Sequence, residues 1–139
     1  MRLVWTALLS CLAVAPAWAE EVPLCGSRPR VTAELTCLFD GDSGWQRGTH
    51  WHLADVDAPE IDPPGADCRE EQILGLRALD RLQRLLSKGY TVTYLGRRDT
   101  SGRQLAKIET EDHRDVGSEL MSAGLAQALP NTGEKWCRR

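Results

Sequence analysis

The sequence predicts an α+β fold, because strand-like and helix-like patterns occupy separate stretches of the 139-residue chain. Apolar and polar residues alternate over residues 31–38, and a second strand is predicted to run back over residues 49–56. Between residues 69 and 88, apolar side chains recur every three or four positions, which is typical of an amphipathic helix. Residues 90–94 are rich in β-branched and aromatic side chains, and residues 104–109 predict one more strand.

The amino terminus has the pattern of a secretory signal peptide over residues 1–19. A basic residue precedes an apolar run that extends to Val14, and the segment ends in the small-residue pattern AWA. The run is too short to span a bilayer stably, so we expect cleavage before Glu20 and no membrane attachment afterwards. The mature protein is then exported, to a periplasm or to the medium, as one domain over residues 20–139.

A second processing route stays open at Cys11. Leu8-Leu9-Ser10-Cys11 resembles the processing box of bacterial lipoproteins. Cleavage there would leave an unusually short apolar region, so the secretory signal is the preferred interpretation.

The charge balance excludes a protein that coats nucleic acid. The chain carries 17 basic and 20 acidic residues, for a net charge of −3. Proteins that bind phosphates through their overall field carry a surplus of basic residues. A polynucleotide substrate would therefore have to be held locally or through a metal ion.

Four cysteines remain after signal cleavage, an even number that predicts two disulfides in an exported protein. Their wide spacing lacks the short C-x2-C pattern of structural zinc sites. Three pairings are possible. We expect one bond to tie the amino-terminal tail to the first strand and the other to tie the long helix to the end of the chain. The pairs are Cys25 with Cys37 and Cys68 with Cys137.

The densest group of candidate ligands lies in residues 39–60, which contain five carboxylates and two histidines. In a regular strand, His52 and Asp57 would lie on opposite faces, so we expect a break or bulge near Asp55. The proline-rich residues 62–67 can continue neither a helix nor a sheet and predict a surface loop beside the acids.

Two helices follow from the pattern and its end signals. The helix over residues 69–88 has acids in its first turn and a basic residue in its last, and Gly89 ends it. Asp115 is expected to cap a shorter second helix that ends at Gly124.

Four motifs in order and spacing resemble the staphylococcal nuclease (thermonuclease) family across residues 32–126. They are Asp40-Gly41-Asp42, then His52-Leu53 with Val56-Asp57-Ala58-Pro59-Glu60, then Asp99-Thr100-Ser101-Gly102-Arg103-Gln104-Leu105-Ala106, and finally Asp115-Val116 with Gly124-Leu125-Ala126. The resemblance implies a five-stranded OB-like β-barrel with two to three helices packed on it. It also implies a metal-dependent phosphodiesterase with nucleic acid as its substrate, and we expect a monomer.

The resemblance also implies a role for each matching residue. Asp42, Asp57 and the backbone carbonyl of Ala58 would bind Ca²⁺, a hard ion that prefers oxygen ligands. Glu60 would orient or deprotonate the attacking water, and Arg103 would donate a charged fork to the phosphate. Asp40 matches the motif too, and its expected role is to stabilise the turn.

His52 stands where active members that this chain resembles carry an arginine that contacts the same phosphate. The residues Thr100, Ser101 and Pro130 replace a lysine and two tyrosines that help to hold the nucleotide. Two functions therefore remain open. The first is a nuclease, with His52 as a weaker phosphate contact. The second is a catalytically weak OB-like module that binds an envelope partner or an oligosaccharide.

Overall fold

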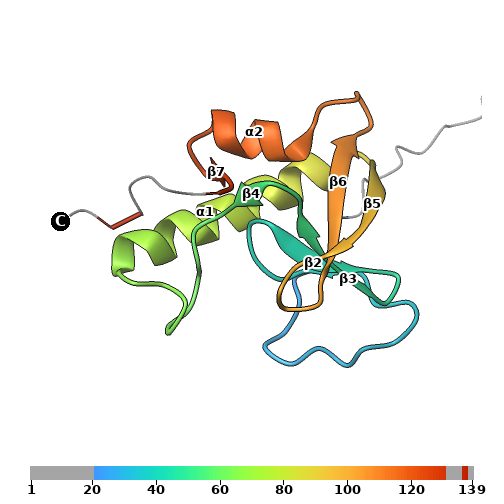
Figure 1. The fold of residues 1–139 in the computed structure, drawn as a ribbon, viewed down its shortest axis with the longest axis horizontal. Coiled ribbons are helices and arrows are strands. Elements are labelled where there is room, and N and C mark those ends of the chain that lie inside the picture. Colours follow the sequence, from blue (N-terminus) through green and yellow to red (C-terminus); the bar gives the residue numbers. More distant parts are fainter. Residues whose placement is uncertain (1–20, 131–135, 138–139) are drawn as a thin grey trace, which may run out of the picture.

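The computed structural model of the chain describes residues 21–130 and 136–137. The predicted signal peptide lies outside these residues. A five-stranded sheet has the order β1-β2-β3-β6-β5, a two-stranded sheet joins β4 to β7, and two helices accompany them (Figure 1). The α+β prediction is therefore confirmed. The elements are β1 (Cys37–Leu38), β2 (Ser43–Gln46), β3 (Thr49–Leu53), β4 (Val56–Asp57), α1 (Arg69–Leu86), β5 (Tyr90–Arg98), β6 (Gln104–Thr110), α2 (Val116–Ser122) and β7 (Gln127–Ala128).

The hydrophobic core lies between the five-stranded sheet and the two helices. Trp51 and Leu53 of β3, Ile108 of β6, Leu82 of α1 and Leu120 of α2 are all at most 2% exposed. β3 pairs with β2 in antiparallel fashion and with β6 in parallel, so it is an interior strand of the sheet. Residues at the end of β3 are thereby fixed from two sides.

The first predicted strand was too long, because only Cys37–Leu38 of residues 31–38 pairs in the sheet. Residues 31–34 are exposed and residues 35–36 are half-buried, and Leu35 donates its backbone N–H to the carbonyl of Thr32 in a turn. This segment contacts the β2–β3 turn, where Gly48 donates its backbone N–H to the carbonyl of Leu35. Alternation of apolar residues thus occurs here without pairing in the sheet and without full burial.

The expected irregularity near Asp55 is confirmed. β3 ends at Leu53, and Asp55 adopts a φ of 61°, in the left-handed region that non-glycine residues rarely occupy. The chain therefore leaves the five-stranded sheet, and β4 pairs with β7 instead. β7 was not predicted, because two residues are too few to produce a periodic pattern. β5 also extends four residues beyond the predicted end at residue 94.

The helix signals hold, with small shifts at the ends. Helix α1 ends at Leu86 rather than residue 88, with Ser87 as its C-cap and Gly89 at φ 107°. Asp115 caps α2 by accepting a hydrogen bond from the backbone N–H of Ser118 at 2.7 Å. In the part of the chain that the structure describes, neither helix is long and apolar enough to cross a membrane.

Both expected disulfides are present, with Cys25 bonded to Cys37 and Cys68 bonded to Cys137. The second disulfide joins positions 69 residues apart, and its Cys68 is the N-cap of α1. Constraining so long a loop in the unfolded chain stabilises the fold by about 4 kcal/mol in the chain-entropy model.

Helix α1 lies directly against the chain that carries the acids. A Cβ built on Gly75 would lie 2.7 Å from the backbone carbonyl oxygens of both Pro59 and Glu60. Ala78 lies one helical turn after Gly75. A Cβ built on Gly41 would lie 2.5 Å from the Cβ of Ala78. Small residues on this face of α1 therefore let the backbone on both sides of the acidic stretch approach closely.

We predict that Gly75→Ala destabilises the protein by about 1–3 kcal/mol, because the new methyl group meets backbone atoms that cannot rotate away. The loss should appear although alanine is favoured over glycine by about 1 kcal/mol within a helix. Urea unfolding followed by circular dichroism measures it. Gly26→Ala is the control, since a Cβ there has no neighbour within 4 Å; equal stability of the two variants would contradict the close approach.

Candidate functional site

Asp40 organises the turn that leads into β2. Its Oδ1 accepts hydrogen bonds from the backbone N–H of Asp42 at 3.2 Å and from the hydroxyl of Ser43 at 2.7 Å. The carboxyl group is almost fully buried. Burial and the neighbouring charge of Asp42 raise the pKa of Asp40 to about 7. These contacts are what a turn-stabilising residue requires.

Asp42 joins three segments of the chain. It is 5% exposed, and its Oδ2 accepts a hydrogen bond of 2.6 Å from the backbone N–H of Ala58, which follows β4. Its Oδ1 lies 3.4 Å from Nε2 of His52 on β3. The first and second predicted metal-binding segments are therefore in direct contact, and Ala58 contributes its N–H to that contact.

His52 lies inside the site rather than on a solvated face. Its Nδ1 is buried and has no hydrogen-bond partner among residues 21–130 and 136–137. The neighbouring His50 is used differently, because its ring stacks on that of Trp45 with centroids 4.5 Å apart and planes within 5°. The imidazole of His52 thus faces the carboxylate of Asp42, at the position where the resemblance implies an arginine.

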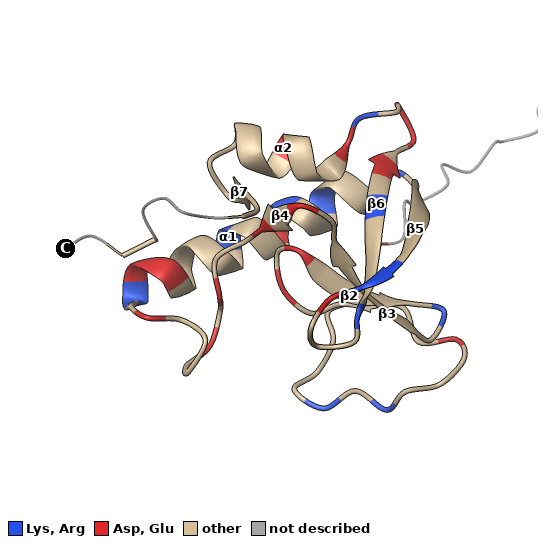
Figure 2. Cartoon of the chain, viewed as in Figure 1, with Lys and Arg blue, Asp and Glu red and all other residues tan. Residues whose placement is uncertain are grey.

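The pKa of Glu60 depends on burial and on the charges of the other predicted site residues. Partial burial raises its pKa, and the negative charges of Asp42, Asp57 and Glu71 raise it further. The positive charge of Arg103 acts in the opposite direction. Coulombic effects of this kind need groups close together. The structure therefore gathers the carboxylates and the guanidinium into one neighbourhood, and Figure 2 shows acidic positions on β4 and on the chain entering β2.

Arg103 is held by the turn between β5 and β6. The Oδ1 of Asp99 accepts hydrogen bonds from the backbone N–H groups of Ser101 and Arg103, both at 2.9 Å. The Oδ2 of Asp99 accepts a hydrogen bond of 2.6 Å from the Nε–H of Arg103. This hydrogen bond uses Nε and not the two terminal guanidinium nitrogens. They are the two donors that form a fork on a phosphate.

Two residues with clear roles lie outside the site that the sequence predicts. Asp99 belongs to the third motif, and an acid four residues before an arginine in a turn is a signal for this ion pair. Glu71 fits the pattern of a first-turn helix acid, which predicts no further role. Its burial, at 6% exposure, comes from packing between distant segments that no local pattern contains.

The donors fit a hard divalent cation. Asp42, Asp57 and the carbonyl of Ala58 offer only oxygen, which Ca²⁺ and Mg²⁺ prefer. Burial is the main cause of the raised pKa of Glu60, and the negative charges of Asp42 and Asp57 add to it. Among the described residues, the potential ligand atoms of Cys68, Glu71 and Cys137 all lie within 4.8 Å of one another. The two sulfurs form a disulfide, so this group is not a metal site.

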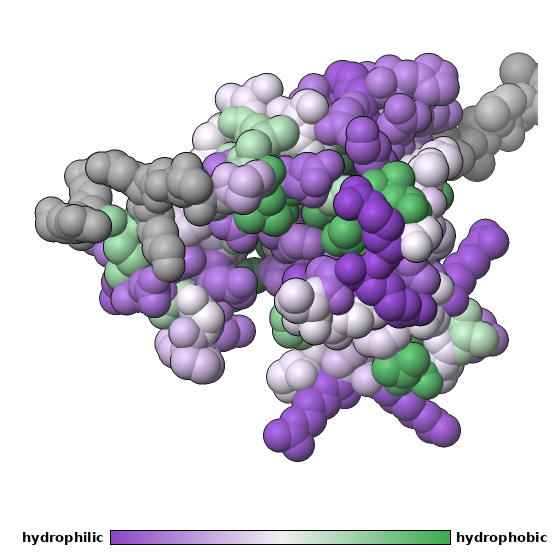
Figure 3. Space-filling view, in the orientation of Figure 1, coloured by the Kyte–Doolittle hydropathy of each residue, from purple (hydrophilic) through white to green (hydrophobic). Residues whose placement is uncertain are grey.

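The face drawn in Figure 3 is mixed, with several separate apolar areas lying among hydrophilic and neutral ones.

Comparison with models of known protein families gives a match. The model of a protein family described as staphylococcal nuclease homologue matches residues 50–136, more than half of the chain. The matched part contains His52, Asp57, Glu60 and Arg103, while Asp42 precedes it. The fold of that family is the OB-fold. No curated protein matches the chain.

We predict that, in the presence of a chelator, the free energy of unfolding falls as pH rises from about 4 to about 7. The pKa of Asp40 is 3.8 in the reference state and about 7 in the folded protein. The folded state therefore binds the proton more tightly in this window, and ionisation at higher pH costs stability. Chemical unfolding at several pH values measures the slope.

Asp40→Asn should flatten that slope, because the amide oxygen still accepts the bonds from Asp42 and Ser43 but does not titrate. Equal slopes in the wild type and the variant would show that Asp40 is ionised throughout the window.

Proposed function

We propose, because this chain belongs to the family of staphylococcal nuclease homologues, that it is an exported hydrolase that cleaves phosphodiester bonds in DNA or RNA with the help of calcium. One observation carries the proposal: Asp42 accepts a hydrogen bond from Ala58, so the two predicted metal-binding segments are in contact. The charges of Asp42, Asp57 and Arg103 all act on the pKa of Glu60, after the larger effect of burial. That arrangement offers ligands for a cation and a separate cation for the phosphate. Two disulfides support the export, because such bonds persist in oxidising compartments.

Asp42, Asp57 and the carbonyl of Ala58 would hold the calcium ion. When bound, the ion would neutralise charge on the phosphate and favour an attacking water. The hydrogen bond between Asp42 and Ala58 already fixes the separation of these two segments before any ion arrives. Preorganised ligands lose less freedom on binding.

Glu60 would take a proton from the attacking water. A raised pKa makes its ionised carboxylate a stronger base, and the causes of the shift are burial and nearby acids. Arg103 would bind two phosphate oxygens through its terminal nitrogens. Asp99 holds the opposite edge of the guanidinium, so little side-chain freedom remains to be lost.

His52 supports a second candidate function, a binding module with little or no catalysis. Its Nε2 is 3.4 Å from Asp42, so the imidazole faces a predicted metal ligand rather than open solvent. An imidazole also lacks the bidentate fork of a guanidinium. The ligand of such a module would be an envelope partner or an oligosaccharide.

We predict that the purified mature protein digests single-stranded DNA when calcium is present and that a chelator abolishes the reaction. Arg103→Ala should lower turnover by about a hundredfold to a thousandfold, the usual loss for one donor that stabilises transition-state charge. Gel or fluorescence assays of DNA cleavage measure both. Arg97→Ala is the control, because Arg97 is an exposed arginine on β5. Calcium-independent cleavage, or equal losses in both variants, would contradict the proposed site.

We also predict that His52→Arg raises turnover at pH 8, by up to about a hundredfold, because a guanidinium keeps its charge and offers two donors. Steady-state cleavage rates at pH 6 and pH 8 measure the effect. Thr91→Arg, at an exposed position of β5, controls for the added positive charge. Flat turnover at both pH values, in a folded variant that still binds calcium, would favour the binding module.

A further inference from the structure

Glu71 is a buried carboxylate to which the proposed function gives no role. It lies in the first turn of α1 and is 6% exposed. An acid in a first turn is stabilised by the helix dipole even when solvent-exposed, so the dipole alone does not explain its burial. Carboxylates are almost never fully buried unless their oxygens are paired. The partners of Glu71 therefore indicate what it does.

The two oxygens of Glu71 hold both ends of one loop. Oε1 accepts a hydrogen bond from the backbone N–H of Glu60 at 3.3 Å. Oε2 accepts a hydrogen bond from the backbone N–H of Asp67 at 2.7 Å. Between these points lies the proline-rich loop of residues 61–66, which contains no helix or strand. One side chain thus replaces the backbone pairing that regular structure would supply.

The loop folds back over the side chain of Glu60. A Cβ built on Gly65 would lie 3.1 Å from Oε2 of Glu60 and 3.2 Å from its Cγ. Gly75 of α1 lies against the backbone carbonyls of Pro59 and Glu60. Helix α1 therefore contacts Glu60 through both its backbone N–H and its backbone carbonyl, while the loop that Glu71 closes contacts its carboxylate.

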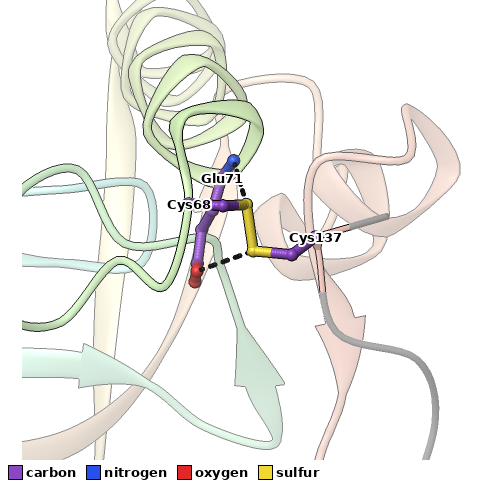
Figure 4. A group of neighbouring side chains, drawn as sticks. All are labelled: Cys68, Glu71 and Cys137. Atoms are coloured by element: carbon purple, nitrogen blue, oxygen red, sulfur yellow. Dashed lines mark hydrogen bonds between the residues drawn. A yellow bond between two sulfur atoms is a disulfide. The ribbon is translucent and has the colours of Figure 1, made fainter. Parts of the chain in front are cut away.

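A disulfide completes the surroundings of Glu71, as Figure 4 shows. Sγ of Cys68 accepts a weak hydrogen bond from the backbone N–H of Glu71 at 3.4 Å. Sγ of Cys137 lies 3.9 Å from Oε2 of Glu71. This sulfur belongs to the Cys68–Cys137 bond and carries no proton, so the second approach is a packing contact. It covers one side of the carboxylate, and hydrogen bonds strengthen where water is excluded.

We propose that Glu71 is a positioning residue that fixes the location of the Glu60 carboxylate through the backbone of residue 60 and the loop up to residue 67. The inference rests on the proposed function, in which Glu60 is the base. A displacement of about 1 Å at a reacting group costs about a hundredfold in rate. Substrate binding by Arg103 does not pass through this loop, so the effect should fall on kcat.

The test compares Glu71→Gln with wild type and with Glu70→Gln, all in the disulfide-bonded form. Glutamine keeps the shape of the side chain but turns an NH₂ group toward one of the two N–H donors, so one hydrogen bond is lost. Glu70 is an exposed acid in the same turn, and its replacement removes the same charge without touching the loop.

The first measurement is amide hydrogen exchange by NMR. In Glu71→Gln we expect exchange at Glu60 or Asp67, or at both, to be at least about tenfold faster, while Ile108 in the core keeps its wild-type rate. The second is steady-state cleavage of single-stranded DNA with calcium. There we expect kcat to fall by about tenfold to a hundredfold, KM to change by less than about twofold, and Glu70→Gln to match wild type.

Unchanged exchange at both loop amides overturns the proposal, as does a loss that falls on KM or appears equally in Glu70→Gln. If wild type cleaves no DNA, the proposed function fails, and the exchange rates alone decide whether Glu71 positions the backbone of Glu60. If exchange at Ile108 rises as well, Glu71→Asp replaces Glu71→Gln. It keeps both acceptor oxygens and the charge but is one methylene too short to reach both N–H groups, and the same outcomes apply.

Discussion

The 2.6 Å hydrogen bond from the backbone N–H of Ala58 to Asp42 is the contact on which the site depends. It joins the turn before β2 to the chain after β4, two segments that the break at Asp55 would otherwise separate. Because the acceptor is a nearly buried carboxylate, the bond is charge-assisted and screened little by water. The position of the other acids relative to Asp42 follows from it.

Helix α1 supplies the second constraint, because it packs against the backbone of the segments that carry the acids. Gly75 and Ala78 allow the backbone near Glu60 and Gly41 to approach the helix, and Glu71 holds the loop that follows Glu60. Burial, and after it the negative charge of neighbouring acids, raises the pKa values of Asp40 and Glu60. Burying these acids close together therefore lowers the free energy of unfolding, but it places negative charge where a cation could bind.

Much of the fold could be predicted from the sequence where the signal is local. The periodicity of α1, the cap at Asp115 and the break at Asp55 each depend on neighbouring residues. Residues 31–36 were misassigned because alternation does not reveal whether a segment reaches the core. The residues of the site were named through a family resemblance, whereas the pairing of Asp99 with Arg103 and the burial of Glu71 required the structure. Both depend on how turns and distant segments are placed in space, which spacing along the chain does not encode.

The Cys68–Cys137 disulfide makes the surroundings of Glu71 depend on an oxidation step. The hydrogen bonds of Glu71 join residues that are close together in the sequence, whereas the sulfur that covers its carboxylate comes from residue 137. Closing the bond to that residue requires an oxidant, which reducing compartments withhold. The redox state of the medium therefore decides whether one wall of this buried carboxylate is covalently fixed.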